Sequence, residues 1–177
     1  MEELNIRQEQ PGDWDAVERT VKEAFAEVPY SDQSEHQLVA RLRASKYFIP
    51  ELSLVAVLEG RIVGHLLLTR IDIVDEHSQH PGLSLAPISV QPEFQNRSIG
   101  SQLIKASHKM AQQMGFNWIV LIGHQDYYPK FGYEEAQKYG ITNSIAAPSE
   151  NFMIKGLKPG VLDQIQGQVK YPKIYFE

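Results

Sequence analysis

The stretch LAPISVQPEFQNRSIGS, residues 85–101, decides how the whole chain is interpreted. Its first six residues are mostly apolar and typical of a buried strand, whereas residues 91–98 are polar and typical of a loop. Apolar residues then recur at helical spacing from Ile99 to about Met114. The first N–H groups of a helix lack partners within it, and the helix dipole places positive charge there. This strand, loop and helix therefore suit a ligand that carries phosphate.

The residue types around this loop also favour a phosphate ligand. Gly100 allows a close approach of backbone to ligand, and Arg97 adds a planar guanidinium. No Asp or Glu occurs between Phe94 and Gln125, although Lys105 and Lys109 lie there. An ordinary crossover from strand to helix, with Ser98 as its N-cap, explains the same pattern. From these residues alone both explanations stay open.

The rest of the chain alternates strands and helices. Strands are expected at 4–7, 52–58, 61–73, 83–90 and 116–122, near 141 and at 152–157, and helices at about 13–28, 34–45, 99–114 and 126–131. Asp13 and the Ser34/Gln37 pair fit N-terminal caps, and Gly115 fits a C-terminal cap. Residues 75–82 are expected to form a solvated loop. Their His, Asp and Glu side chains do not predict a metal site, because zinc requires three or four ligands on fixed elements.

Composition limits the class of protein. The 177 residues suit one domain, which we expect to span residues 1–177, and the 42% of hydrophobic residues is an ordinary globular value. The chain has no cysteine, which excludes disulfides, zinc-thiolate sites and a catalytic thiol. The longest apolar runs have five residues, too few to span a membrane, and the acidic start does not resemble a signal peptide. We therefore expect a cytoplasmic protein with no membrane partner.

Charge is distributed unevenly along the chain. The formal net charge of −5 argues against a nucleic-acid partner, because nucleic-acid binders are usually basic. Residues 1–35 hold ten acidic and three basic residues, a net charge of −7, so the remainder carries +2. The acidic start suggests a cationic partner, whereas a solvated acidic helix is the plainer explanation.

Two sequence blocks resemble a known family. QNRSIG, residues 95–100, follows a strand that ends Val90-Gln91-Pro92 and resembles the acetyl-CoA-binding motif Q/R-x-x-G-x-G/A of the GNAT superfamily of N-acetyltransferases. It agrees at Gln95 and Gly100 and departs at Ser98, where the family usually has its first glycine. YYPKFGY, residues 127–133, resembles the Y-Y-x-x-F-G-F signature of the YhbS-like bacterial branch, as does the tail from Phe152.

The resemblance implies a fold and a cosubstrate. The fold would be an α/β (α+β) GNAT fold, a mixed and mostly antiparallel twisted sheet of about seven strands with about four helices. Strands 83–90 and 116–122 would splay apart in a V. Acetyl-CoA would be the acyl donor, with no metal. Its pyrophosphate would lie on the N–H groups of residues 95–101, and its pantetheine arm would pair with the backbone of residues 88–90. The implied cofactor-binding residues are Ile88, Ser89, Val90, Gln95, Asn96, Arg97, Ser98, Ile99, Gly100 and Ser101.

The resemblance also suggests catalytic residues. Tyr128 lies four residues before Gly132, where the family usually keeps a tyrosine, and a phenol can protonate a departing thiolate. We therefore expect Tyr128 to be the general acid. The base stays open among His124, Asp126, His65 and ordered water. His124, which follows the end of a strand, is the candidate we name, because an imidazole can act as a base. By family analogy, the acceptor side would be lined by Glu27 and Tyr30.

Two functions from different classes fit these observations. The first is an acetyl-CoA-dependent N-acetyltransferase that moves the acetyl group directly to a primary amine of a small molecule or peptide. The second is a non-catalytic domain that binds or senses acyl-CoA. A nucleotide-phosphate-binding domain fits less well, because the chain has no G-x-x-x-x-G-K-[ST] motif. Either a monomer or a homodimer is compatible with the sequence.

Overall fold

The structure is a computed structural model, and it describes residues 3–177. Contacts divide the chain into two compact units. The first unit contains the chain up to Leu68 together with Ala86–Met110, and the second contains Thr69–Leu85 together with Ala111–Glu177. Two strands and one helix therefore pass from one unit into the other.

The first unit contains strands in the order β1-β2-β3-β4. β1 (Asn5–Gln8) lies antiparallel to β2 (Phe48–Leu58), with Asn5 opposite Val57. β3 (Arg61–Val74) follows β2 after the two-residue turn Glu59-Gly60, and β4 (Gln79–Val90) follows β3. Both turn residues have positive φ, 51° and 73°, as the tightest hairpin turns require. The expected long hairpin is confirmed.

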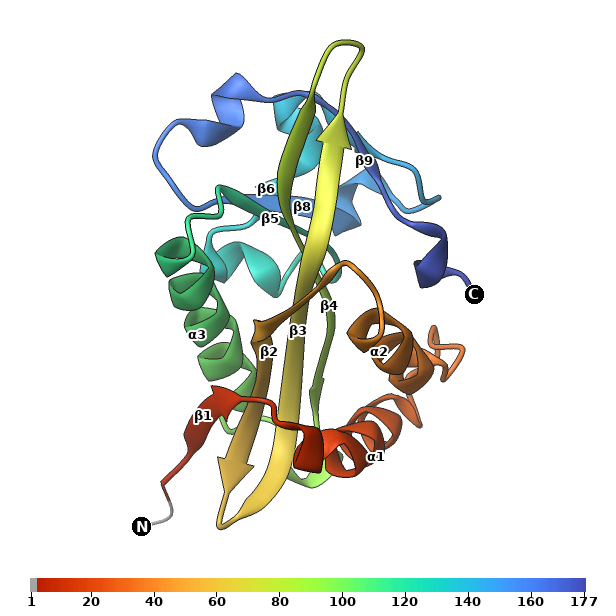
Figure 1. The fold of residues 1–177 in the computed structure, drawn as a ribbon, viewed down its shortest axis with the longest axis vertical. Helices are drawn as coiled ribbons and strands as arrows, with labels where there is room; N and C mark the ends of the chain where they lie inside the picture. The colour runs from red at the N-terminus through yellow and green to blue at the C-terminus, as the bar shows by residue number, and fades with distance from the viewer. Residues whose placement is uncertain (1–2) are drawn as a thin grey trace. The chain divides into compact units, whose positions relative to one another are not determined.

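Two helices pack against this hairpin. A 3-10 turn, η1 (Pro11–Asp13), leads into α1 (Trp14–Phe25), and α2 (Glu35–Arg43) follows (Figure 1). Their shared apolar cluster consists of Val17, Val21, Val39, Val55 and Ile62. Burial of these side chains stabilises the packing of the helices on the hairpin by roughly 1.5–3 kcal/mol for each fully buried side chain.

The predicted N-terminal caps are wrong in detail. Asp13 stands at the N-cap of α1, but its carboxylate accepts hydrogen bonds from Arg7 and from the Gln10 N–H rather than from the helix. The Ser34 hydroxyl donates to Asp32 at 2.6 Å and does not cap α2. In both cases a neighbouring polar group competes successfully for the capping side chain.

α3 (Ile99–Gln113) begins in the first unit and packs closely on β3. A Cβ at Gly64 would lie 3.1 Å from Leu103 Cδ1 and 3.2 Å from the Ser89 carbonyl oxygen, so the helix depends on a glycine at this position. Gly115 ends the helix with φ 86° and donates to the Gln112 carbonyl, as expected.

The second unit holds the remaining strands. β5 (Trp118–Ile122) pairs in parallel with β4 at Leu83 and Ser84, and it pairs antiparallel with β8 (Phe152–Gly156). β6 (Glu134–Glu135) adds to β8, while β9 (Gly167–Lys170) joins β3 to β7 (Ile141–Asn143). The connecting 3-10 turns are η2 (Pro92–Phe94), η3 (Tyr128–Phe131), η4 (Ala136–Tyr139), η5 (Ser149–Asn151), η6 (Val161–Gln164) and η7 (Lys173–Tyr175). The core of this unit includes Ile73, Trp118, Ile154 and Val169.

The mixed, mostly antiparallel fold agrees with the expectation, but some boundaries differ. β4 begins at Gln79, so the loop after β3 is shorter than the expected 75–82. The Asp75 carboxylate accepts hydrogen bonds from the His77 and Ser78 N–H groups, which lowers its pKa to about 2. This carboxylate organises the turn. Residues 3–177 contain no group of three or more His, Cys, Asp or Glu side chains placed to hold a metal ion.

None of the helices that the structure describes is both long and apolar enough to cross a membrane.

Candidate active site

The loop between β4 and α3 has an unusual backbone. Gln95, Asn96, Arg97 and Ser98 are all exposed, and Asn96 and Ser98 have φ angles of 63° and 62°. These angles lie in the left-handed region, which costs a residue other than glycine roughly 1–2 kcal/mol. Ser98 therefore adopts a glycine-like conformation at the position where the family motif usually has glycine.

Local hydrogen bonds hold this loop to the strand and the helix. The Gln95 side-chain amide donates to the Val90 carbonyl at 3.0 Å, and the Gln102 N–H donates to the Ser98 carbonyl at 3.1 Å. Ile99 is buried and anchors the start of α3, whose first turn carries no acidic residue. Because no acidic side chain opposes the positive end of the helix dipole, this end of the helix is attractive to an anion.

Ile88, Ser89 and Val90 are the last three residues of β4, directly before the loop. Ser89 is buried, with 3% of its surface exposed, and its Oγ has no hydrogen-bond partner among the described residues. Ile88 and Val90 are half-buried. β5 pairs with β4 only upstream of this segment, at Leu83 and Ser84. Arg97 lies with its guanidinium carbon 5.3 Å from the centre of the Phe94 ring.

Tyr128 occupies a defined position in the second unit. It begins η3, is half-buried, and its ring makes edge-to-face contacts with Tyr127 and Tyr133 at 5.0 and 5.9 Å between ring centres. Tyr133 is fully buried, and burial together with Tyr128 raises its pKa well above the usual value. Gly132 closes the turn with φ 97°, so the predicted helix over 126–131 is in fact a shorter 3-10 turn.

The candidate bases differ in their access to solvent. His124 and Asp126 are exposed, and the His124 carbonyl accepts the N–H of Tyr127 at 3.1 Å. His65 is fully buried, and burial lowers its pKa to about 4. Of these three candidates, His65 alone has no access to solvent, so it is not available to an acceptor amine in this structure.

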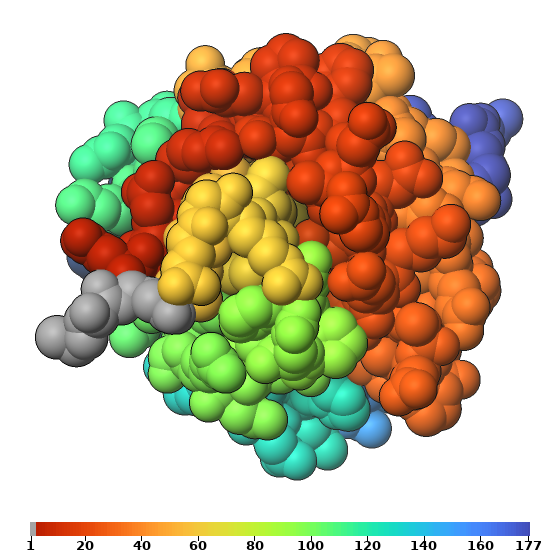
Figure 2. All heavy atoms as spheres, turned by 90° about the horizontal axis from the view of Figure 1, so that it is seen from below, coloured from red at the N-terminus to blue at the C-terminus, as the bar shows by residue number. Residues whose placement is uncertain are grey.

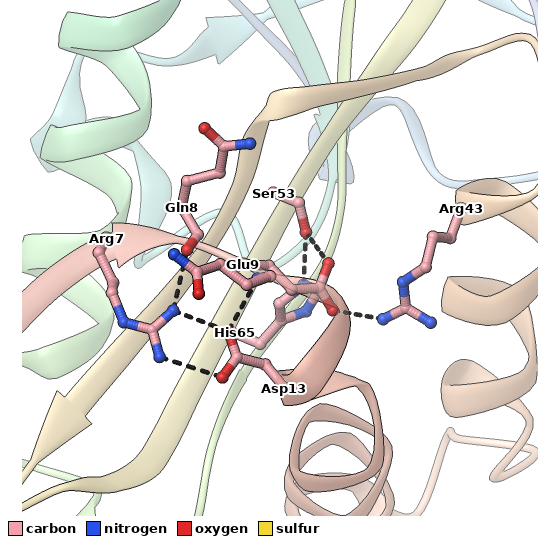
Figure 3. Close-up of polar contacts among 8 residues, drawn as sticks. Arg7, Gln8, Glu9, Asp13, Arg43, Ser53 and His65 are labelled. Atoms are coloured by element: carbon pink, nitrogen blue, oxygen red, sulfur yellow. Dashed lines mark hydrogen bonds and ion pairs between the residues drawn. The ribbon is translucent and has the colours of Figure 1, made fainter.

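His65 belongs to a buried polar cluster that the sequence did not indicate. Its Nε2 lies 3.1 Å from the Ser53 hydroxyl, which donates to Glu9 at 2.6 Å, and Arg43 forms an ion pair with the other oxygen of Glu9 (Figure 3). The cluster ties α2 to β2, β3 and the residue that follows β1. Its members are far apart in the sequence, Glu9 and Arg43 by 34 positions, and no local pattern brings them together.

A cavity of about 560 Å³ lies beside the loop within the first unit. One wall is the C-terminal end of α1 and the residues after it, with Glu23 and Glu27, and the other is the 91–95 segment, with Glu93. Glu27 lines this cavity, whereas Tyr30 is 75% exposed and is not part of its lining. No arginine or lysine lines this cavity among the described residues.

The fold and the loop together place the chain in the GNAT class of α/β folds. The chain belongs to the family described as the Acetyltransferase (GNAT) domain, which matches residues 5–136. The uncharacterized N-acetyltransferase YjhQ of Escherichia coli is 38% identical over 100 residues, which cover 56% of this chain and 55% of YjhQ. The chain thus spans about half the length of that relative. The uncharacterized N-acetyltransferase YhbS of E. coli is 25% identical over 94% of this chain and 95% of its own.

Solved structures agree on the fold. The crystal structure of YhbS from E. coli, in complex with CoA, has a TM-score of 0.88 at 20% identity and covers 98% of this chain and 92% of its own. A GNAT family acetyltransferase from Brucella melitensis, in complex with acetyl-CoA, has a TM-score of 0.81 at 29% identity, with 98% of each chain covered. The predicted resemblance to the YhbS-like branch is confirmed.

Proposed function

We propose that this protein is an N-acetyltransferase that moves the acetyl group of acetyl-CoA directly to a primary amine. The observation that carries the proposal is the exposed loop Gln95–Ser98, whose two left-handed residues lead into the acid-free start of α3. The acetyl-CoA complex of the Brucella protein, a relative at 29% identity, supports acetyl-CoA as the donor.

The residues present fit a pyrophosphate. The Gln95 N–H donates to the Pro92 carbonyl, so the N–H groups of residues 96–101 are the proposed donors to the pyrophosphate. Arg97 supplies a positive charge, and Gly100 adds no side chain that would block the approach. Ile88, Ser89 and Val90 are the proposed partners of the pantetheine amides, which would extend the sheet by backbone hydrogen bonds. The Val90 carbonyl, which accepts from Gln95, has a second lone pair for such a bond.

The proposed chemistry needs proton transfer at two points. An alkylammonium acceptor must first lose a proton, because its pKa near 10.4 leaves it protonated at neutral pH. His124, which is exposed, is the proposed base, directly or through water. Tyr128 is the proposed acid that supplies a proton to the departing CoA thiolate. Its packing between Tyr127 and Tyr133 favours a fixed position for the phenol, which general-acid catalysis requires.

We infer that the acceptor is a cationic amine. Glu93 is paired with Arg61, but the carboxylates of Glu23 and Glu27 in the lining of the cavity favour a molecule with more than one positive charge, such as a polyamine or a lysine-containing peptide. A neutral amine of the same length would lack this attraction.

Thiol release in the presence of acetyl-CoA tests the proposal. The protein should release free CoA thiol only when an amine is added, with diamines and lysine peptides better than neutral monoamines. Acetyl-CoA binding with no amine-dependent release would instead identify a domain that binds or senses acyl-CoA. Glu27→Gln should raise KM for a dicationic acceptor and leave KM for acetyl-CoA unchanged.

A further inference from the structure

Arg61, the first residue of β3, contacts the neighbouring loop through three different groups. One of its guanidinium nitrogens, NH2, donates to Gln91 Oε1 at 3.0 Å and to Glu93 Oε1 at 2.6 Å. Its guanidinium carbon also lies 5.2 Å from the centre of the Phe94 ring. All four residues belong to the first unit, and Figure 2 shows the β2–β3 hairpin, in yellow, directly beside the 91–98 loop, in green.

Gln91 makes this contact rigid. It is buried, with 4% of its surface exposed, and its amide nitrogen donates to the Thr20 hydroxyl of α1 and to the Ile62 carbonyl of β3. Its backbone N–H donates to the Val63 carbonyl at 2.9 Å. Arg61 therefore joins the loop to a residue that is itself fixed to α1 and β3.

The same contact does little for global stability. The Arg61 and Glu93 side chains are 56% and 60% exposed, and exposed ion pairs add at most about 1 kcal/mol to folding. The loop, however, holds Asn96 and Ser98 in a costly conformation, which contacts from outside the loop must maintain. Phe94 links Arg61 to Arg97, because the guanidinium groups of both arginines lie over the Phe94 ring.

We propose that Arg61 is a positioning residue for acetyl-CoA binding, which holds the loop in its binding conformation through Gln91, Glu93 and Phe94 without touching the cofactor. This inference rests on the proposed function, because it takes the N–H groups of residues 96–101 as the pyrophosphate site. Removal of the guanidinium should release the loop, so that acetyl-CoA must order it on binding.

A double-mutant cycle with acetyl-CoA titrations tests this role. Arg61→Met keeps the side-chain stem but loses the hydrogen bonds, and it should raise Kd for acetyl-CoA about tenfold, or about 1.4 kcal/mol. Glu93→Ala should raise Kd less, and the double variant should resemble Arg61→Met alone, because both changes break the same contact. Arg61→Lys should restore part of the affinity. KM for acetyl-CoA should rise while kcat at saturation stays unchanged.

Three results would overturn this assignment. Unchanged Kd in Arg61→Met, with binding abolished in the matched variant Gly100→Asp, would refute the role of Arg61 and leave the proposed function intact. Tighter binding by Glu93→Ala, or additive effects in the double variant, would show that Arg61 contacts the cofactor directly. A fall in kcat and melting temperature together would show a purely structural role. Unchanged affinity in Gly100→Asp would instead contradict the proposed phosphate site itself.

Discussion

The ring of Tyr128 lies against the backbone of Gly123, at the end of β5. A Cβ placed on Gly123 would stand 2.4 Å from Cε2 of that ring, closer than any side chain tolerates. Tyr127, by contrast, contacts Lys130 and Phe131. The two rings contact each other, but only the Tyr128 ring lies against Gly123, and the lack of a side chain at Gly123 makes room for it.

Tyr128→Phe should lower kcat and kcat/KM equally, by about 10²–10⁴, and leave acetyl-CoA affinity nearly unchanged. The phenylalanine keeps the ring contacts but cannot donate a proton to the leaving thiolate. Steady-state kinetics with an active acceptor measure the effect.

Two companion variants control this test. Tyr127→Phe should lower kcat only slightly, because the Tyr127 hydroxyl has no proposed role in the reaction. Gly123→Ala should lower kcat, since the added methyl group displaces the Tyr128 ring. If Tyr127→Phe were the slow variant, the roles of the two tyrosines would be exchanged, and if neither were slow, the acid would be a different group.

Ser98→Gly should stabilise the protein by about 1 kcal/mol, because glycine adopts φ near 62° without the steric cost that serine bears. For a chain of this length, that gain corresponds to about 2–4 °C in melting temperature. Acetyl-CoA affinity should be retained. Asn96→Gly should gain less, because asparagine tolerates this conformation better than serine. A destabilised Ser98→Gly protein would show that the serine hydroxyl holds the loop.

The free energy of unfolding should fall as pH falls from 6.5 to 4. Burial lowers the pKa of His65 to about 4 in the folded protein, near Glu9 and Arg43, whereas an unfolded histidine titrates near 6.5. Between these two pKa values the unfolded chain binds more protons than the folded protein, so acid favours unfolding. The loss of stability reaches up to about 3 kcal/mol once the pH is below the folded pKa. Denaturant unfolding of wild type and His65→Gln across this range measures the contribution. The two slopes against pH should differ, and equal slopes would show that His65 is not buried as a neutral ring.

Acetyl-CoA should stabilise the folded protein. At a concentration 100-fold above Kd, linkage predicts about 2.7 kcal/mol, which is about 5–10 °C in melting temperature for a chain of this size. Gly100→Asp should abolish this shift without lowering the melting temperature of the free protein by a comparable amount, because it places a negative charge in the phosphate site. An unchanged melting temperature of the wild-type protein in millimolar acetyl-CoA would contradict the assignment of acetyl-CoA as the acyl donor.

Local patterns were sufficient to predict the elements that carry local signals. The β2–β3 hairpin follows from its apolar strands and the Glu59-Gly60 turn, and α3 follows from its helical spacing and Gly115. β6 and β9 were missed, because two and four residues are too short for a pattern and pair only through distant strands.

The site was predictable only where residues are adjacent in sequence. The loop Gln95–Ser101 and the turn that bears Tyr128 each form one segment, so a motif could reveal them. The contacts of Arg61 with Gln91 and Glu93 cross about 30 positions, and the Glu9–Arg43 pair crosses 34. Such pairs depend on how the hairpin, α2 and the loop pack, and no spacing rule in the sequence encodes them.

The most direct test of the proposed function follows an isotopically labelled acetyl group. The protein is incubated with labelled acetyl-CoA and a diamine or lysine peptide, and the products are measured by mass spectrometry. Our account predicts label on the acceptor amine in amounts equal to the free CoA released, with no labelled protein intermediate. Acetyl-CoA that binds tightly while every acceptor stays unlabelled would contradict the assignment of an N-acetyltransferase.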